Sequence, residues 1–191
     1  MDRSEKLRAL LALHVAGARL GRAPDFVALV DLAGPRLLAH ARRLSDDGET
    51  ARDIVQESWA AVASGLHGLR DDRAFLPWAL AIVTRAAARE LKARIRARET
   101  LAELARQLPE PGADPPDLRS AINALPAGQR AALALFYLDG LSVTEVATAL
   151  AIPPGTVKTR LMHARNRLRA LMKGDDHGRT GSTHRRGSCR G

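Results

Sequence analysis

The chain has a single cysteine in 191 residues, and this scarcity limits the classes to which it can belong. With only Cys189 available, the sequence excludes a disulfide framework and a cysteine-based metal cluster. No apolar run approaches the roughly 18 residues that suggest a membrane span, and the N-terminus lacks the layout of a signal peptide. These absences predict a soluble protein of a reducing compartment, the cytoplasm, without membrane insertion.

Aromatic residues and acids are also scarce. Aromatics make up 3% of a chain that is 46% hydrophobic, so any core consists mainly of Leu, Ala and Val. The 21 acidic residues face 30 Lys and Arg, which gives a formal net charge of +9. Such an excess of positive charge favours nucleic acid or another anionic surface as a partner.

Patterns typical of enzymes are missing as well. The six histidines are scattered, and the carboxylate pairs at 46–47 and 71–72 have no His or Lys at helical spacing for acid-base chemistry. There is no Gly-rich phosphate-binding loop. We therefore expect no enzymatic activity, no catalytic residue, no metal site and no cofactor.

Strand-like alternation is absent, while helical spacing of apolar residues recurs along the chain, which predicts an all-α fold. Between Glu99 and Leu118, four prolines and five acids against one base (local net charge −4) indicate an interdomain linker. A plain solubilising spacer would explain this composition almost as well. The expected units are an N-terminal helical extension (1–24), a first helical domain (25–98), an acidic, Pro-rich linker (99–121), a second domain (122–173) and a disordered basic tail (174–191).

Two local expectations concern the first domain. Gly34 and Pro35 should kink or divide the helix that contains them. Thr50, followed by Asp53, is the expected N-cap of the next helix, which should run to about residue 67.

The second domain carries a helix-turn-helix pattern. Ser142 and Glu145 have the spacing of a capping box, and the Pro-Pro-Gly run at 153–155 must end the short helix that they open. A new helix starts near Thr156. Two helices joined by a tight turn predict a DNA-binding unit whose second helix enters the major groove. An ordinary helical hairpin with a solvated basic face remains the alternative. The second helix has a narrow apolar stripe of Val157, Leu161, Ala164, Leu168 and Leu171.

The other faces of this second helix are polar or basic, since no acid occurs between Pro153 and Lys173. A second basic segment, 85–98, closes the first domain with six basic residues and one acid. An acidic and polar cluster, Asp53, Gln56 and Glu57, shares one face of an earlier helix. The face opposite the apolar stripe holds Thr159, Met162, His163 and Asn166, flanked by Lys158, Arg165 and Arg169 on one side and by Arg160 and Arg167 on the other.

Three segments carry a family resemblance: DIVQESW at 53–59, FLPWALAIVTRAA at 75–87, and the helix-turn-helix stretch at 125–169. Together they resemble the bacterial sigma factors of the extracytoplasmic-function (ECF) type over about residues 25–97 and 122–172. The resemblance implies a sigma region 2-like helical bundle and a sigma region 4-like helix-turn-helix domain. It also implies an alternative sigma factor of the bacterial cytoplasm and nucleoid, which binds RNA polymerase core and promotes transcription initiation.

The resemblance also implies partners and site residues. In that family the first domain binds the β′ clamp of the polymerase and captures the single-stranded minus-ten element, while the second reads the minus-thirty-five duplex and docks on the β flap. An anti-sigma factor is a further expected partner. The implied core-binding residues are Asp53, Gln56 and Glu57; those for the minus-ten element and melting are Trp78, Arg85, Arg89, Lys92, Arg94 and Arg96; those for the minus-thirty-five element are Thr156, Lys158, Thr159, Arg160, Met162, His163, Arg165, Asn166 and Arg169.

The chain departs from the family pattern at four of these positions. Arg85 and Arg89 stand where asparagine and aspartate are common, and Met162 and His163 replace the frequent histidine and arginine, so an unusual promoter preference is expected. For Trp78, burial in the core and stacking on an unpaired base are both open. Two other functions also remain open: a sigma-like decoy that occupies an anti-sigma factor, and a conventional helix-turn-helix regulator.

Overall fold

The structure, a computed structural model, describes residues 3–45, 47–104 and 118–173, and these residues form helices joined by short turns, which confirms the all-α prediction. No described helix has the length and apolarity needed to cross a bilayer. The central acidic part of the expected linker and the basic tail lie outside the described residues. The helices are α1 (Arg3–Arg19), α2 (Ala23–Leu44), α3 (Gly48–Gly65), α4 (Phe75–Leu104), α5 (Leu118–Asn123), α6 (Ala127–Leu133, continued by a π-helical turn, Ala134–Leu138), α7 (Val143–Leu150) and α8 (Pro154–Lys173).

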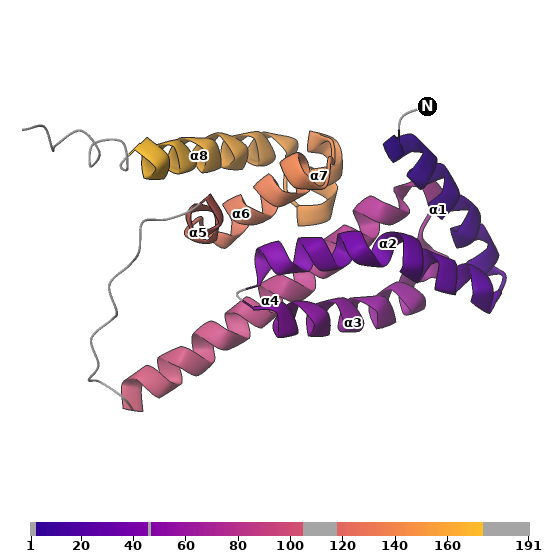
Figure 1. Cartoon of the computed structure of the whole chain (residues 1–191), viewed down its shortest axis with the longest axis horizontal. Coiled ribbons are helices and arrows are strands. Elements are labelled where there is room, and N and C mark those ends of the chain that lie inside the picture. The colour runs from indigo at the N-terminus through magenta and orange to yellow at the C-terminus, as the bar shows by residue number, and fades with distance from the viewer. Residues whose placement is uncertain (1–2, 46, 105–117, 174–191) are drawn as a thin grey trace, which may run out of the picture.

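The helices form two stacked units (Figure 1). In the first unit, α1, α2 and α3 pack around the N-terminal half of α4, and the C-terminal half of α4 projects away from the other helices. In the second unit, α5, α6 and α7 pack against α8. The α8 helix lies on the outside, with α6 and α7 between it and the first unit. This order leaves one long side of α8 facing solvent.

The N-terminal helix α1 belongs to the core of the first unit. Leu11 and Val15 are fully buried in that core, and the His14 ring lies 2.8 Å from the carboxylate of Asp25 on α2. The Asp25 carboxylate fills the space that a Cβ at residue 17 would need, so glycine at that position lets Asp25 lie beside His14.

Pro35 does not divide α2, contrary to that part of the expectation. The helix runs unbroken from Ala23 to Leu44, and residues on both sides of the proline, including Ala33 and Leu37, are fully buried. Proline removes one backbone hydrogen bond from a helix interior. Burial of the apolar stripe on both sides offsets that loss, because packing contributes more to helix stability in proteins than local propensity does.

The N-cap of α3 was assigned incorrectly from the sequence: it is Asp47 and not Thr50. The Asp47 carboxylate accepts a hydrogen bond from the Thr50 amide at 2.7 Å and another from the Thr50 hydroxyl at 2.8 Å. Thr50 thus takes part as a donor, one turn inside the helix. The error is one of three residues within a loop where several neighbours are good capping residues.

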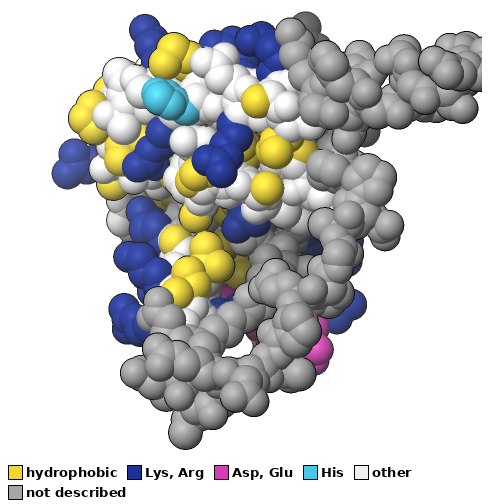
Figure 2. Space-filling view, turned by 90° about the vertical axis from the view of Figure 1, so that its left-hand side faces the viewer, with side chains coloured by type: hydrophobic (Ala, Val, Ile, Leu, Met, Phe, Trp, Pro, Cys, Tyr) yellow, Lys and Arg dark blue, Asp and Glu magenta, His cyan; other side chains and the backbone are white. Residues whose placement is uncertain are grey.

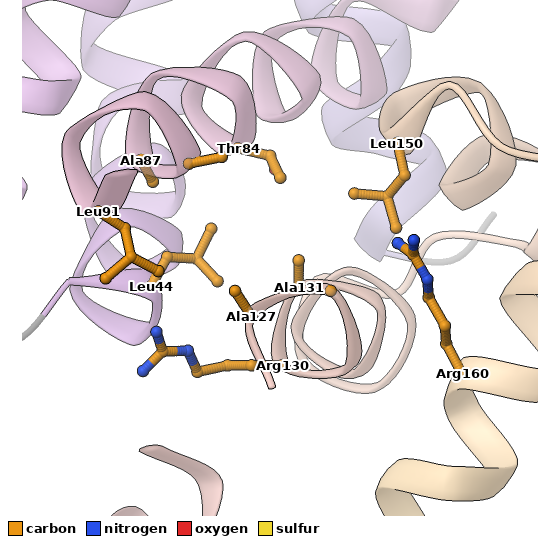
Figure 3. A pocket seen from close by; sticks show the side chains of 11 residues that line it. Leu44, Thr84, Ala87, Leu91, Ala127, Arg130, Ala131, Leu150 and Arg160 are labelled. Atoms are coloured by element: carbon orange, nitrogen blue, oxygen red, sulfur yellow. The ribbon is translucent and has the colours of Figure 1, made fainter. Parts of the chain in front are cut away.

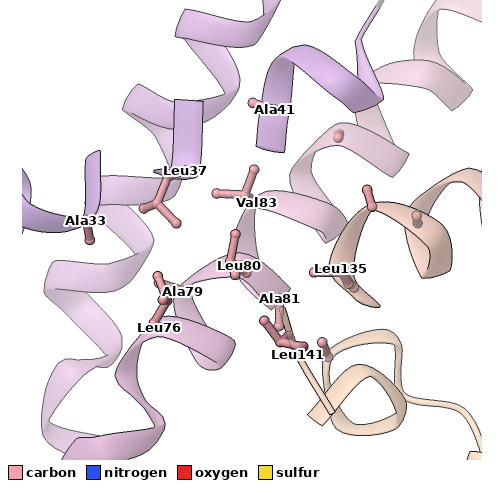
Figure 4. Packing of buried hydrophobic residues seen from close by; sticks show 14 of the residues in the cluster. Ala33, Leu37, Ala41, Leu76, Ala79, Leu80, Ala81, Val83, Leu135 and Leu141 are labelled. Carbon is pink, nitrogen blue, oxygen red and sulfur yellow. The ribbon is translucent and has the colours of Figure 1, made fainter. Parts of the chain in front are cut away.

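One hydrophobic cluster runs through both units. Leu80, Ala81 and Val83 of α4 belong to the same buried cluster as Leu135 and Leu141 of the second unit, and Ala81 lies beside Leu141 (Figure 4). A smaller cluster inside the second unit contains Leu125, Leu133 and Ala164. The two units therefore share a core instead of being separate on a tether.

Candidate nucleic-acid interface

The first helix of the helix-turn-helix, α7, begins at the predicted capping box. The Ser142 hydroxyl accepts a hydrogen bond from the Glu145 amide at 3.2 Å, and the Glu145 carboxylate accepts one from the Ser142 amide at 2.8 Å. Burial alone would raise the pKa of Glu145, but the hydrogen bonds from Ser142 and the nearby charge of Arg8 outweigh it, so that the pKa is lowered. The cap fixes where α7 starts.

The turn between α7 and α8 is set by two residues. Ala151 adopts the left-handed conformation, with φ 52° and ψ 47°, which is costly for a residue with a Cβ. Pro154 then occupies the first position of α8, where its fixed φ suits a helix and its missing N–H is not needed. This tight turn orients α8 against α7.

The predicted apolar stripe holds α8 in place. Val157 and Ala164 are fully buried and Leu161 is 6% exposed, while Leu168 and Leu171 are half-buried near the C-terminal end. The stripe was therefore predicted correctly, and it packs on α6 and α7.

The opposite side of α8 is open to solvent. Thr159, Met162, His163 and Asn166 are all exposed, and Met162 keeps 45% of its surface exposed although its side chain is apolar. We call these four residues the reading face. Lys158, Arg165 and Arg169 beside it are exposed too. On this exposed side of the helix, the flanking Lys and Arg side chains suit contacts to DNA phosphates. The varied side chains in the middle suit contacts to the edges of the nucleobases.

Arg160 and Thr156 differ from the other residues predicted on α8, because both are half-buried. The Arg160 guanidinium lies over Gly128 of α6, where a Cβ would come within 3.0 Å of it. In Figure 3, Arg160 reaches from α8 toward Leu150, on one side of a cleft between the two units. In this arrangement Arg160 is therefore a contact between helices and is turned away from the reading face.

The α4 helix presents the second basic surface. Arg85, Arg89 and Lys92 are exposed and recur at intervals of four and three, so they share one side of the helix. They surround a surface cleft of about 440 Å³ to which Ile82 and Ala61 add apolar contacts. We call these five residues the α4 cleft. Cations around an apolar floor match the chemistry of an unpaired nucleotide, whose phosphate is anionic and whose base is flat and apolar.

Arg94 is less accessible than these three cations. It donates hydrogen bonds to Asp47 and Thr50 at 2.7 Å each, and lies 3.4 Å from Glu90. The pKa of Asp47 is held well below its usual range. The largest cause is the hydrogen bond from the Thr50 amide, and the second is the hydrogen bond from Arg94. Arg94 thus ties α4 to the start of α3. Arg96 is exposed further along α4.

Trp78 is half-buried, in the turn of α4 that precedes the α4 cleft. Its ring packs against Phe75 with centroids 6.1 Å apart and lies so close to Gly65 that a Cβ there would come within 3.0 Å. These contacts support the packing role for Trp78 over the base-stacking role.

The predicted core-binding residues Asp53, Gln56 and Glu57 are exposed together on α3. Glu57 forms a 2.6 Å ion pair with Arg89 of α4, and both side chains remain more than 60% exposed. A surface pair of this kind contributes little to stability, about 0.2–1 kcal/mol. The ion pair does show, however, that the predicted polymerase-binding face and the α4 cleft adjoin each other.

Positive charge gathers where the C-terminal ends of α4 and α8 face the same way. Figure 2 shows this side of the molecule, with Lys and Arg side chains spread over it and acidic side chains visible only near its lower right edge. The described residues contain no group of three or more His, Cys, Asp or Glu that could hold a metal ion. Fold and surface together define a two-part helical protein that binds nucleic acid.

Comparisons with known proteins agree with this class and refine it. The family description "Sigma-70 region 2" matches residues 29–97, and "Sigma-70, region 4" matches residues 117–168. The ECF RNA polymerase sigma factor SigM of Mycobacterium tuberculosis is 32% identical over 171 residues, covering 85% of this chain and 83% of SigM. SigW of Bacillus subtilis is 24% identical over 186 residues, covering 87% of this chain and 99% of its own.

Two solved structures have the same architecture. CnrH, in complex with the cytosolic domain of CnrY, gives a TM-score of 0.68 at 26% identity over 87% of this chain and 99% of its own. The sigma factor RpoE of Bartonella quintana, in complex with the anti-sigma factor NepR, gives 0.62 at 27% identity over 79% and 98%. The chain therefore belongs to the ECF RNA polymerase sigma factors, which are alternative factors for transcription initiation.

Proposed function

We propose that the two basic surfaces divide promoter recognition between them. The reading face of α8 and its flanking cations bind the minus-thirty-five duplex, and the α4 cleft binds the unpaired strand of the minus-ten element. The exposed side of α3, with Asp53, Gln56 and Glu57, contacts the β′ clamp of the polymerase, and the second unit docks on the β flap. The observation that carries this proposal is the presence of two exposed cationic helix sides on units that match sigma regions 2 and 4.

The protein acts by binding alone, without enzymatic chemistry, in the bacterial cytoplasm at the nucleoid. Its relatives RpoE and CnrH were solved with protein partners, of which NepR is described as an anti-sigma factor. An anti-sigma factor is accordingly a proposed partner of this chain. A decoy that only occupied such a factor would have no use for an open reading face, so that alternative is the weaker one.

The test is to assemble the full chain with bacterial core polymerase on a promoter that depends on it. Nuclease footprints should show protection of the minus-thirty-five element, and permanganate should show unpaired thymines at the minus-ten element. Arg165→Ala should weaken the first signal, and Arg85→Ala with Arg89→Ala should weaken the second. If each set of substitutions affected both signals equally, the proposed division would be wrong.

A further inference from the structure

The cleft between the two units has mostly apolar walls. The first unit contributes Leu44, at the end of α2, and one side of α4 with Ala87 and Leu91; the second contributes Ala131 of α6 and Leu150 of α7 (Figure 3). The volume is about 170 Å³. Alanines on α4 and α6 leave this space open, because their side chains are too short to meet across it. The cleft is therefore a hollow inside the fold, lined by residues of both units.

One charged side chain is buried at this cleft. Arg130 of α6 lines it and is 5% exposed, and it is the only buried Lys, Arg, Asp or Glu among the described residues. Its Nε atom has no hydrogen-bond partner there, and its Nη1 atom donates only a long hydrogen bond, 3.5 Å, to the Asn123 carbonyl. A buried guanidinium without an acceptor costs free energy. A ligand that placed an acceptor beside Nε would remove this cost.

The other polar groups of the cleft define its charge. The Thr84 hydroxyl is already occupied, since it donates to the Leu80 carbonyl at 2.8 Å and lies 2.9 Å from the His40 ring. Arg160 lines the cleft at the end opposite Arg130 (Figure 3). No acidic side chain is among the described residues that line it. The cleft thus combines apolar walls with positive charge alone.

This combination selects a class of ligand. Small-molecule sites are mostly apolar, with a few polar groups that fix the orientation of the ligand. An arginine binds a carboxylate through two parallel hydrogen bonds. Inorganic phosphate would leave the apolar walls without a contact, and a neutral apolar molecule would leave Nε unpaired. An apolar cavity of about 150 Å³ in another protein holds benzene, so this cleft has room for about one ring and a small substituent.

We propose that the cleft is a binding site for a small organic acid with an apolar body, of about the size of benzoate. The carboxylate accepts hydrogen bonds from Arg130, and the apolar body lies against Leu44, Leu91 and Ala131. None of the residues that line the cleft belongs to the reading face or to the α4 cleft. The site therefore goes beyond promoter recognition and does not rest on the proposed function.

Binding of such an acid would stabilise the fold. A ligand that binds only the folded chain raises the ratio of folded to unfolded molecules by about 100-fold when its free concentration is 100 times its Kd. Because the walls come from both units, this stabilisation requires their packing in the same molecule. The acid thus acts as a stabilising effector of the whole chain.

The experiment is titration calorimetry of the full chain with three probes. Benzoate has both the ring and the carboxylate, benzamide keeps the ring without the charge, and acetate keeps the carboxylate without the ring. We expect benzoate to bind at one site per chain and about tenfold or more tighter than either other probe. The reason is that only benzoate both pairs Arg130 and fills the apolar cleft.

Two variants locate the site. Arg130→Met removes the guanidinium while keeping a long side chain, and should weaken benzoate binding by about tenfold or more. It should not lower the melting temperature of the free protein, because the guanidinium has no charged partner to lose. Ala131→Leu should fill the cleft and abolish binding. Arg52→Met, at an exposed position on α3 outside the cleft, is the matched control and should leave binding unchanged.

Circular dichroism establishes that each variant is folded, and the comparison of the three probes on the unchanged chain requires no variant. The inference is wrong if benzoate does not bind, or if acetate or benzamide binds as tightly as benzoate. It is also wrong if folded Arg130→Met binds benzoate as the unchanged chain does. These outcomes involve neither polymerase nor DNA, so they leave the proposed function to its own test.

Discussion

Ala151 occupies the one left-handed backbone position found at a non-glycine residue within the described ranges, and it lies in the turn that orients the recognition helix. A Cβ in this conformation costs roughly 1 kcal/mol or more. Local strain of this kind is tolerated because the capping box before α7 and the buried stripe of α8 determine the turn from both sides.

Ala151→Gly should therefore stabilise the protein, by about 0.5–1 kcal/mol, because glycine adopts this conformation without a steric cost. Chemical denaturation gives the free energy of unfolding. The control is Ala60→Gly, at a position with ordinary helical geometry in α3, which should destabilise by about 0.5–1 kcal/mol. Equal effects at both positions would contradict this explanation of the turn.

The lowered pKa of Glu145 makes part of the stability depend on pH. A carboxyl group whose pKa falls on folding contributes stability above its unfolded pKa, here about 4.5, and this contribution is lost as the pH falls below that value. Glu145→Gln should cost about 0.5 kcal/mol at neutral pH and progressively less below pH 4.5. Melting temperatures of both proteins between pH 7 and pH 3 check this; a constant difference would show that the carboxylate charge is unimportant.

Among the elements, α8 was the most predictable from sequence and α3 the least. The apolar stripe of α8 repeats at helical spacing over four turns, so periodicity alone identified its buried side. The start of α3 was misplaced because Asp47 and Thr50 are both good capping residues, and only the backbone course distinguishes them. The expectation that Pro35 might divide α2 failed for a related reason. The burial that keeps α2 intact around Pro35 depends on contacts with residues distant in sequence, which the local pattern does not show.

Within α8, some residues should position the protein on the DNA and others should discriminate between base pairs. Arg165→Ala should weaken binding to all promoters by a similar factor, because a phosphate contact carries no sequence information. Substitution of Met162 or His163 should change the ranking of promoters instead, by about 1–3 kcal/mol at the base pair concerned. A panel of minus-thirty-five variants, measured with the assembled holoenzyme, tests the distinction. Identical patterns for the two kinds of variant would refute it.

Within α4, the cleft should act through charge. Removing Arg85, Arg89 and Lys92 together should weaken binding of the holoenzyme to promoter DNA with an unpaired minus-ten strand. It should also reduce the slope of log affinity against log salt by about 0.7 for each phosphate that the variant no longer neutralises. Arg52→Ala, an exposed cation on α3, serves as the control. An unchanged slope in the triple variant would exclude the α4 cleft as a phosphate site.

At the scale of the whole molecule, the contact between the two units could not be predicted from the sequence. His40 looked like one of six scattered histidines, and its partner Asp139 is 99 residues away with no local pattern to connect them. The N-terminal helix likewise looked like an appendage, whereas Leu11 and Val15 bury it in the core. Family resemblance located the two units and their surfaces, but their packing arises from contacts between residues far apart in this sequence.

The central claim, that this chain directs transcription initiation from its own promoters, is tested most directly by run-off transcription. Purified bacterial core polymerase is incubated with pooled genomic promoter fragments, with and without the full chain. We expect discrete start sites that require the protein and share upstream sequences at both promoter elements, and that disappear with the Arg85, Arg89 and Lys92 triple variant. A chain that bound core polymerase yet produced no start sites on any fragment would contradict the claim.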